Sequence, residues 1–252
     1  MTLSKKYKIV TAREAPDLVS RAAEGIHNEW PEFMLHDPVA DYLSDCYEKL
    51  PDYQFVLIET GTEEPLALGN SIPLAWHGEL NNLPDDGWDW ALLKGMEDLR
   101  NGRKPSILCA LQIVVFGNNR GKGMSSEVVR AMKQIGQSAG LKGMIAPVRP
   151  NQKCNFPLML VEKYITWTDD NGRPFDPWLR VHHKLGARIV KPCRSAMRIS
   201  GSVAEWESWT GMSFPDSGQY VVSGALVPVE IDREADRGSY VEPNVWMYHP
   251  PE

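Results

Sequence analysis

A glycine-rich loop between an apolar segment and an amphipathic segment constrains the fold of this chain more than any other feature. Residues 106–116 (SILCALQIVVF) are the most apolar stretch and are typical of a fully buried strand. The loop, residues 120–125 (RGKGMS), follows closely. Apolar residues then recur at helical spacing, at Val128, Met132, Ile135 and Ala139. Residues 143–148 supply the next strand. This order predicts a right-handed βαβ unit with near-parallel strands, and it places the loop at the carboxyl edge of a sheet.

The remaining segments predict further strands and helices around this unit, and therefore an α/β (α+β) fold. Apolar patterns and turn residues predict strands over residues 7–10, 54–59, 66–76, 187–199 and 219–229. Helices are expected over residues 15–26 and 88–99, after Asp37-Pro38 and after Asp176-Pro177. We expect one domain over residues 1–230, with insertions at about 78–105 and 151–175, the first of which resembles a cap or lid. A C-terminal tail, residues 231–252, is expected to pack on the surface of this domain.

Net charge and hydropathy exclude several classes of function. The chain carries 27 Lys and Arg against 33 Asp and Glu, a net charge of -6, whereas binding to nucleic acid needs a basic footprint. No apolar run approaches the roughly 18–20 residues of a membrane span, and the N-terminus MTLSKKYKIV lacks the apolar core of a signal peptide. We therefore expect a cytoplasmic protein with neither a nucleic-acid nor a membrane partner.

The cysteines and histidines show no redox or metal-ligand spacing. The four cysteines lie far apart without a C-x-x-C pair, at Cys46, Cys109, Cys154 and Cys193. They are expected to be reduced thiols that pack in the interior. His182 and His183 are adjacent and diverge on a helix, which argues against a shared metal ion. The sequence thus predicts no metal site.

The glycine-rich loop predicts a site for an anion. Backbone N–H groups at the positive end of a helix dipole favour phosphate, and glycine lets the backbone approach it closely. A Walker loop does not fit, because Gly117 and Gly121 are four residues apart instead of five and Lys122 is followed by glycine. A dinucleotide fingerprint does not fit either, because Ser126 stands where its third glycine belongs. An exposed turn that binds nothing is the alternative that remains open.

The loop and its context resemble the pyrophosphate loop, R-x-x-G-x-[GA], of the GNAT acyltransferase superfamily. Arg120, Gly123 and Ser125 match this pattern, with serine in place of the usual glycine or alanine. The resemblance implies a GNAT fold, which is a central mixed, mostly antiparallel sheet flanked by helices, and acetyl-CoA or a related acyl-CoA as substrate. It also implies that pantetheine pairs with the backbone of the splayed strand before the loop. The implied CoA-binding residues are Gln112, Ile113, Val114, Val115, Arg120, Gly121, Lys122, Gly123, Met124 and Ser125.

A second resemblance concerns a late helix. Many GNAT enzymes carry a Y-x-x-x-G motif there, in which the tyrosine protonates the departing thiolate. Residues 182–186 (HHKLG) are similar to this motif, with His182 in the position of the tyrosine. A histidine titrates near neutral pH and acts as acid or base, so we expect His182 to be catalytic and to give the rate a limb near neutral pH. The alternative is a surface histidine without a catalytic role.

Residues 175–182 (FDPWLRVH) also resemble the D-P-x-L-R-x-H segment of GNAT-like loading domains in polyketide synthases. Those domains handle malonyl or acetyl thioesters and pair such a histidine with an arginine further along the chain. Arg198 is the nearest match here and Arg194 is a second candidate, since a guanidinium holds a carboxylate bidentately. The threonine of the loading domains falls at Val148, which argues against decarboxylation.

The sequence therefore predicts an enzyme that transfers an acetyl or short acyl group directly from acyl-CoA to an amine, with His182 and Arg198 as candidate catalytic residues. A first alternative is an S-acyltransferase or decarboxylase that acts on malonyl or acetyl thioesters and a carrier protein. A second alternative is a non-catalytic acyl-CoA-binding module. The expected acceptor is a small-molecule amine or a carrier protein, and a homodimer is left open.

Overall fold

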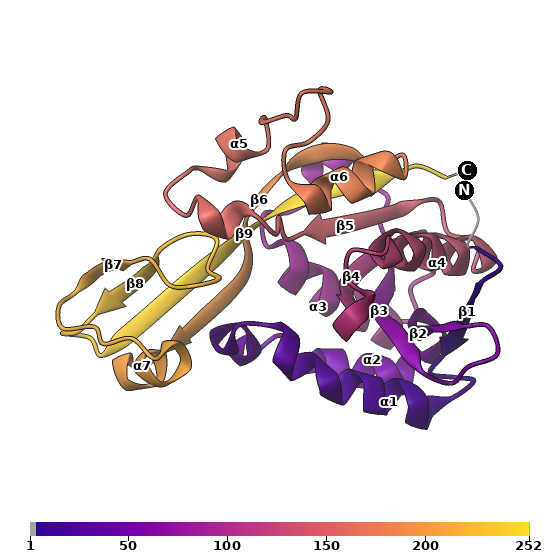
Figure 1. Cartoon of the computed structure of the whole chain (residues 1–252), viewed down its shortest axis with the longest axis horizontal. Coiled ribbons are helices and arrows are strands. Elements are labelled where there is room, and N and C mark those ends of the chain that lie inside the picture. The colour runs from indigo at the N-terminus through magenta and orange to yellow at the C-terminus, as the bar shows by residue number, and fades with distance from the viewer. Residues whose placement is uncertain (1–3, 252) are drawn as a thin grey trace.

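The computed structural model describes the backbone of residues 4–251 and all of their side chains except those of residues 27, 28 and 118. Its strands form one 9-stranded sheet in the order β1-β2-β3-β4-β5-β9-β8-β7, with β6 paired to β9 (Figure 1). The β4–β5 pair is parallel, and the other pairs between the described strands are antiparallel. The strands are β1 (Tyr7–Thr11), β2 (Gln54–Glu59), β3 (Pro65–Leu74), β4 (Ile107–Val115), β5 (Met144–Val148), β6 (Arg188–Gly201), β7 (Gly218–Tyr220), β8 (Val229–Asp232) and β9 (Arg237–His249). This mixed, mostly antiparallel sheet confirms the predicted fold class.

Helices cover both faces of the sheet. Helices α4 and α6 pack on one face, where they meet Leu108 of β4 and Ala146 of β5. Helices α2 and α3 pack on the opposite face with the next residue of β4, Cys109, because successive side chains of a strand point to opposite sides. No helix within residues 4–251 is long and apolar enough to cross a membrane. The described α-helices are α1 (Pro16–Glu24), α2 (Tyr42–Lys49), α3 (Gly87–Arg100), α4 (Met124–Ser138), α5 (Val161–Tyr164), α6 (Pro177–Lys184) and α7 (Val203–Thr210).

The βαβ unit predicted from the glycine-rich loop is confirmed. Strand β4, helix α4 and strand β5 follow one another, and the two strands are parallel. Helix α6 also begins where the sequence indicated. The carboxylate of Asp176 accepts hydrogen bonds from the backbone N–H groups of Trp178 and Leu179, at 2.8 and 3.2 Å, and Pro177 occupies the first turn. An aspartate cap followed by proline is a strong start signal for a helix, and here it fixes the position of His182.

The C-terminal segment was wrongly predicted to be a surface tail. Residues 237–249 form β9, which lies between β5 and β6 and pairs with both (Figure 1). Val245, Trp246 and Met247 are fully buried. Pro243 is tolerated inside this strand because it lies opposite an irregularity of β6 between Cys193 and Met197, where the missing N–H breaks no regular ladder.

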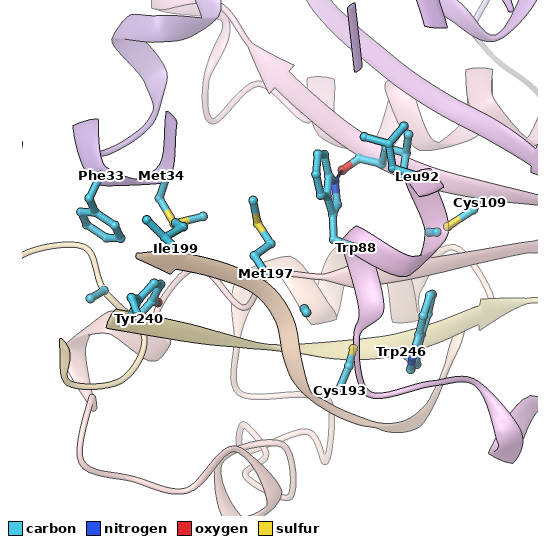
Figure 2. Close-up of a cluster of buried hydrophobic side chains, with 14 of the residues drawn as sticks. Phe33, Met34, Trp88, Leu92, Cys109, Cys193, Met197, Ile199, Tyr240 and Trp246 are labelled. Atoms are coloured by element: carbon cyan, nitrogen blue, oxygen red, sulfur yellow. Dashed lines mark hydrogen bonds between the residues drawn. The ribbon is translucent and has the colours of Figure 1, made fainter. Parts of the chain in front are cut away.

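Helix α3 occupies the insertion that the sequence marked as a cap or lid, and it is part of the core instead. Ala91 and Leu92 are fully buried, and the helix packs against β3 and β6. Figure 2 shows Trp88 and Leu92 of α3 in the same cluster as Met197 of β6 and Trp246 of β9. This helix therefore supports the sheet beneath the candidate site.

Candidate active site

Strands β4 and β5 diverge after a short parallel contact. Within the described strands, their register consists of Leu108 opposite Met144 and Cys109 opposite Ile145. Strand β4 stays paired with β3 as far as Val115, with an irregularity at Leu111, whose carbonyl oxygen accepts a hydrogen bond from Trp88 Nε1 at 2.9 Å. A bulge of this kind bends a strand. The backbone groups of residues 112–115 that face β5 therefore have no partner in that strand. An extended ligand that contains amides can form hydrogen bonds with them.

The loop after β4 leaves open space at the first turn of α4. Gly121 and Gly123 have φ values of +77° and +79°, in the left-handed region that favours glycine. A Cβ atom at either position would meet no atom within 4 Å. Gly123 precedes the first residue of α4, so the positive end of the helix dipole points at this space. Arg120 is exposed and forms an ion pair with Glu29. An open, basic helix N-terminus of this kind fits a pyrophosphate.

A cavity of about 370 Å³ lies between the diverging strands and the segment that contains α1 and α2. Residues 110–113 of β4, residues 146–148 of β5 and the following Arg149 line its sheet side. Gln112 and Ile113 from the predicted set are among them. Residues Trp30, Asp41 and Tyr47 contribute to the opposite wall. The cavity thus connects the open edge of β4 with a part of the chain that sequence reasoning did not connect to the site.

His182 lines this cavity from helix α6. The side chain is 1% exposed, and its ring packs edge-on against Trp178 with centroids 4.6 Å apart. Its Nδ1 lies 2.9 Å from Nε2 of His249, a residue of β9. Burial, and next the neighbouring His249, hold the pKa of His182 well below 6.5. The surface alternative is therefore wrong, and so is the expectation of titration near neutral pH, because the ring is neutral there.

The comparisons with known proteins identify the family. No family model matches the chain. It is 31% identical to the arginine N-acetyltransferase avaD of Aspergillus versicolor over 280 residues, which cover 99% of this chain and 96% of that protein. The chain belongs to the GNAT superfamily of N-acyltransferases. The family prediction is thereby confirmed, and the protein is an acyl-CoA-dependent enzyme that transfers an acyl group to an amine.

Two solved structures share the fold of this GNAT enzyme, each at 16% sequence identity. The loading GNATL domain of CurA from Lyngbya majuscula has a TM-score of 0.57, with 97% of each chain covered. The GphF GNAT-like decarboxylase in complex with isobutyryl-CoA has a TM-score of 0.50, with 97% of this chain and 100% of that chain covered. Both agree with the predicted likeness to loading domains at the level of the fold.

Arg198 does not line the cavity that His182 lines. The Arg198 side chain is 61% exposed and lies 3.6 Å from Asp86, and it is not among the residues that line the cavity. Arg194 pairs with Glu162 and Asp85 instead. Val148 does line the cavity, in the place where the loading domains were expected to carry threonine. The histidine and arginine pair of the loading domains is therefore not assembled here, and Arg198 has no part in the mechanism proposed below.

The cavity contains a buried ion pair that sequence reasoning missed. Arg149 Nε lies 3.0 and 2.8 Å from the two carboxylate oxygens of Glu242, and its Nη2 donates to the carbonyl oxygen of Gly224 at 2.6 Å. The Tyr240 hydroxyl donates to Glu242 at 2.9 Å. Burial raises the pKa of Glu242, and Arg149 partly offsets this effect. Arg149 directly follows β5, and Glu242 belongs to the segment that was predicted to be a tail, so no local pattern joined them.

Arg149→Met is expected to destabilise the protein by about 3–5 kcal/mol, because it leaves the fully buried Glu242 carboxylate without its cation. Urea unfolding measures the change. Lys49→Met is the matched control, since Lys49 pairs with Asp45 on the surface and its loss should cost about 0–1 kcal/mol. Equal effects of the two substitutions would show that the buried pair does not stabilise the fold.

Two more carboxyl groups belong to residues close in the chain to residues that line the cavity, because Asp89 follows Trp88 and Asp37 is two residues after Leu35. Asp37 and Asp89 are 2% and 8% exposed, and Oδ2 of Asp37 and Oδ1 of Asp89 are buried without a hydrogen-bond partner among the described residues. Burial, followed by the charge of Asp37, raises the pKa of Asp89 to about 8. The pair therefore holds one proton at neutral pH.

Asp89→Asn is expected to stabilise the protein, and the gain should grow as the pH rises from about 5 to about 8. The folded pKa of Asp89 is raised, so folding takes up a proton in this range, and wild-type stability falls by up to about 1.4 kcal/mol per pH unit. Asparagine has no such proton to lose and can donate to Asp37. Urea unfolding at both pH values tests this expectation. An identical pH slope in the two proteins would refute the shared proton.

Proposed function

We propose that this enzyme transfers an acetyl group from acetyl-CoA to a basic nitrogen of arginine or of a closely similar cationic amine. The acceptor is suggested by the 31% identical relative, which is named an arginine N-acetyltransferase. The observation that carries the proposal is the cavity, which joins the open edge of β4 to a wall to which Asp41 and Trp30 contribute. A carboxylate attracts a cationic acceptor, and the Trp30 ring already has a cation over it, the Arg149 guanidinium at 5.8 Å from its centroid.

The donor would occupy the open edge of β4 and the loop that follows it. Backbone groups of residues 112–115 would pair with the amides of pantetheine, and residues 120–125 would hold the pyrophosphate at the start of α4. The open space at Gly121 and Gly123 supports this position, because a bound phosphate needs close approach to the backbone there. This orientation directs the thioester into the cavity that His182 lines.

His182 would act on the reacting atoms through its Nε2, because Nδ1 is engaged with His249. A neutral imidazole accepts a proton from the acceptor nitrogen, and the same position lets it protonate the departing thiolate. Transfer is proposed to be direct. Burial raises the pKa of both Cys109 and Cys193, which keeps these thiols protonated and poorly nucleophilic. Neither thiol supports a covalent acyl-enzyme.

A panel of acceptors tests the proposal. The purified enzyme is incubated with acetyl-CoA and, separately, with arginine, lysine, agmatine or a phosphopantetheine-bearing carrier protein, and products are identified by mass spectrometry. We expect N-acetylarginine as the main product, and fragmentation locates the acetylated nitrogen. Preferential acetylation of another amine would replace arginine as the acceptor. A thioester on the carrier protein without any amide would contradict the proposed function.

A further inference from the structure

Two buried histidines link the reaction cavity to a second, much smaller cavity. His182 lines the first cavity, and His249 lines the second, which has a volume of about 10 Å³ and is bordered by Lys133, Gly143 and Pro250. Both rings are almost fully buried, and the 2.9 Å contact between His182 Nδ1 and His249 Nε2 joins them directly. The two residues therefore form a continuous path from one cavity to the other.

Each ring has one nitrogen left for the cavity on its own side. The contact between the rings uses Nδ1 of His182, which leaves Nε2 for the reaction cavity. The same contact uses Nε2 of His249. Nδ1 of His249 is buried without a hydrogen-bond partner among the described residues. The second cavity is about the size that one water molecule requires, which would give this nitrogen a partner. An imidazole can accept a proton on one nitrogen and release one from the other.

The reaction must dispose of one proton. A basic amine arrives as an ammonium ion, whereas the products are an amide and a neutral thiol, so one proton is released per turnover. The nitrogen must first give up a proton before its lone pair can attack the thioester carbon. The carbon–sulfur bond then breaks with its electron pair on sulfur, and the thiolate takes the second proton that the nitrogen loses. The first proton has to leave the reaction cavity while both substrates occupy it.

We propose that His182 and His249 form a proton relay that carries this proton from the reaction cavity to the second cavity. The ammonium proton passes to His182 Nε2, the Nδ1 proton of His182 passes to His249 Nε2, and the Nδ1 proton of His249 passes to water. After product release, water in the open reaction cavity takes the Nε2 proton of His182, His249 returns its Nε2 proton to His182 Nδ1, and water in the second cavity returns a proton to His249 Nδ1. The relay therefore removes the proton while substrates fill the reaction cavity, and one proton per turnover reaches solvent. The relay rests on the proposed amine acetylation and makes His249 a positioning and proton-transferring residue that acts through His182.

The charges around the relay favour two neutral rings. His249 faces His182 on α6 and Lys133 on α4, and burial, followed by the charge of Lys133, lowers its pKa to about 4. A weak contact with the backbone of Leu185 offsets part of this shift. His182 faces His249 and the uncharged ring of Trp178. A proton that enters this pair is therefore not retained on either ring.

The test compares His249→Gln and His249→Ala with the wild-type enzyme, with acetyl-CoA and arginine as substrates. Glutamine can keep a hydrogen bond to His182 but cannot pass a proton, so kcat should fall at least about tenfold with KM for acetyl-CoA unchanged. In His249→Ala, kcat should fall by at least as much. Added imidazole should raise the kcat of this variant several-fold, because it fills the space that the histidine ring occupied. This rescue should increase with the neutral fraction of imidazole as the pH rises. His183→Gln, at an exposed position of the same helix, is the control.

The outcomes separate the relay from the proposed function. Wild-type kcat in His249→Gln, together with normal amide formation, would overturn the relay alone. Loss of activity in His249→Ala that imidazole does not restore, in a variant that melts at the wild-type temperature, would also overturn it. If His249→Ala fails to fold, the kcat and KM values of His249→Gln decide. Absence of any amide from the wild-type enzyme would overturn both proposals.

Discussion

His182→Ala is expected to lower kcat by about a hundredfold or more while leaving the affinity for CoA within about twofold of the wild type. The ring lines the reaction cavity, whereas the proposed CoA contacts belong to β4 and the loop before α4. Binding and chemistry should therefore separate. Steady-state kinetics and calorimetric titration with CoA measure the two effects, and thermal melting checks that the buried site has not collapsed.

The pH dependence adds an independent signature. Because burial lowers the pKa of His182 well below 6.5, the ring stays neutral around pH 7 and accepts a proton only as the pH falls through the lower, folded value. The wild-type rate should be flat near neutrality and should fall on the acid side, and His182→Ala should lack that acid limb. His183→Ala is the matched control, since this neighbour is exposed. Similar losses in the two variants would exclude a specific role for His182.

Gly123→Val is expected to weaken CoA binding at least tenfold, or by about 1.4 kcal/mol. Gly123 has a φ of +79°, which a β-branched residue adopts only with strain, and a valine side chain would enter the open space at the start of α4. The valine side chain would then occupy the space that the pyrophosphate needs. Calorimetric titration with CoA measures the loss directly.

Gly140→Val separates this steric effect from backbone strain. Gly140 has a φ of +72°, also meets no atom within 4 Å, and lies just after the other end of α4. Gly140→Val should therefore lower the stability of the fold about as much as Gly123→Val does, without weakening the binding of CoA. If Gly123→Val and Gly140→Val bind CoA equally well, the pyrophosphate does not rest on this loop.

Local patterns were sufficient for the half of the site that is proposed to bind CoA. Three features each determine the structure of only the few residues around them. They are the apolar run that forms β4, the glycines before α4 and the Asp176 cap of α6. A glycine with positive φ and an aspartate followed by proline have the same consequence in most folds. The aspartate followed by proline predicted the start of α6, and with it the position of His182.

The other half of the site depends on contacts that no local pattern contains. His182 and His249 are 67 residues apart, and Arg149 and Glu242 are 93 apart. Both contacts require β9 to enter the sheet between β5 and β6. In the sequence alone, a proline such as Pro243 argues against a strand, because proline has no N–H for the ladder. The irregularity in β6 that accommodates Pro243 is visible only once the two strands are paired. The continuous apolar run of residues 245–248 (VWMY) was the available signal.

A crystal structure of the enzyme with bound CoA tests the central claim most directly. We predict that the pyrophosphate accepts hydrogen bonds from the backbone N–H groups of residues 121–125, that pantetheine pairs with residues 112–115, and that the sulfur atom lies beside His182 Nε2. A pyrophosphate bound away from the start of α4, or a sulfur atom outside the cavity that His182 lines, would contradict the account.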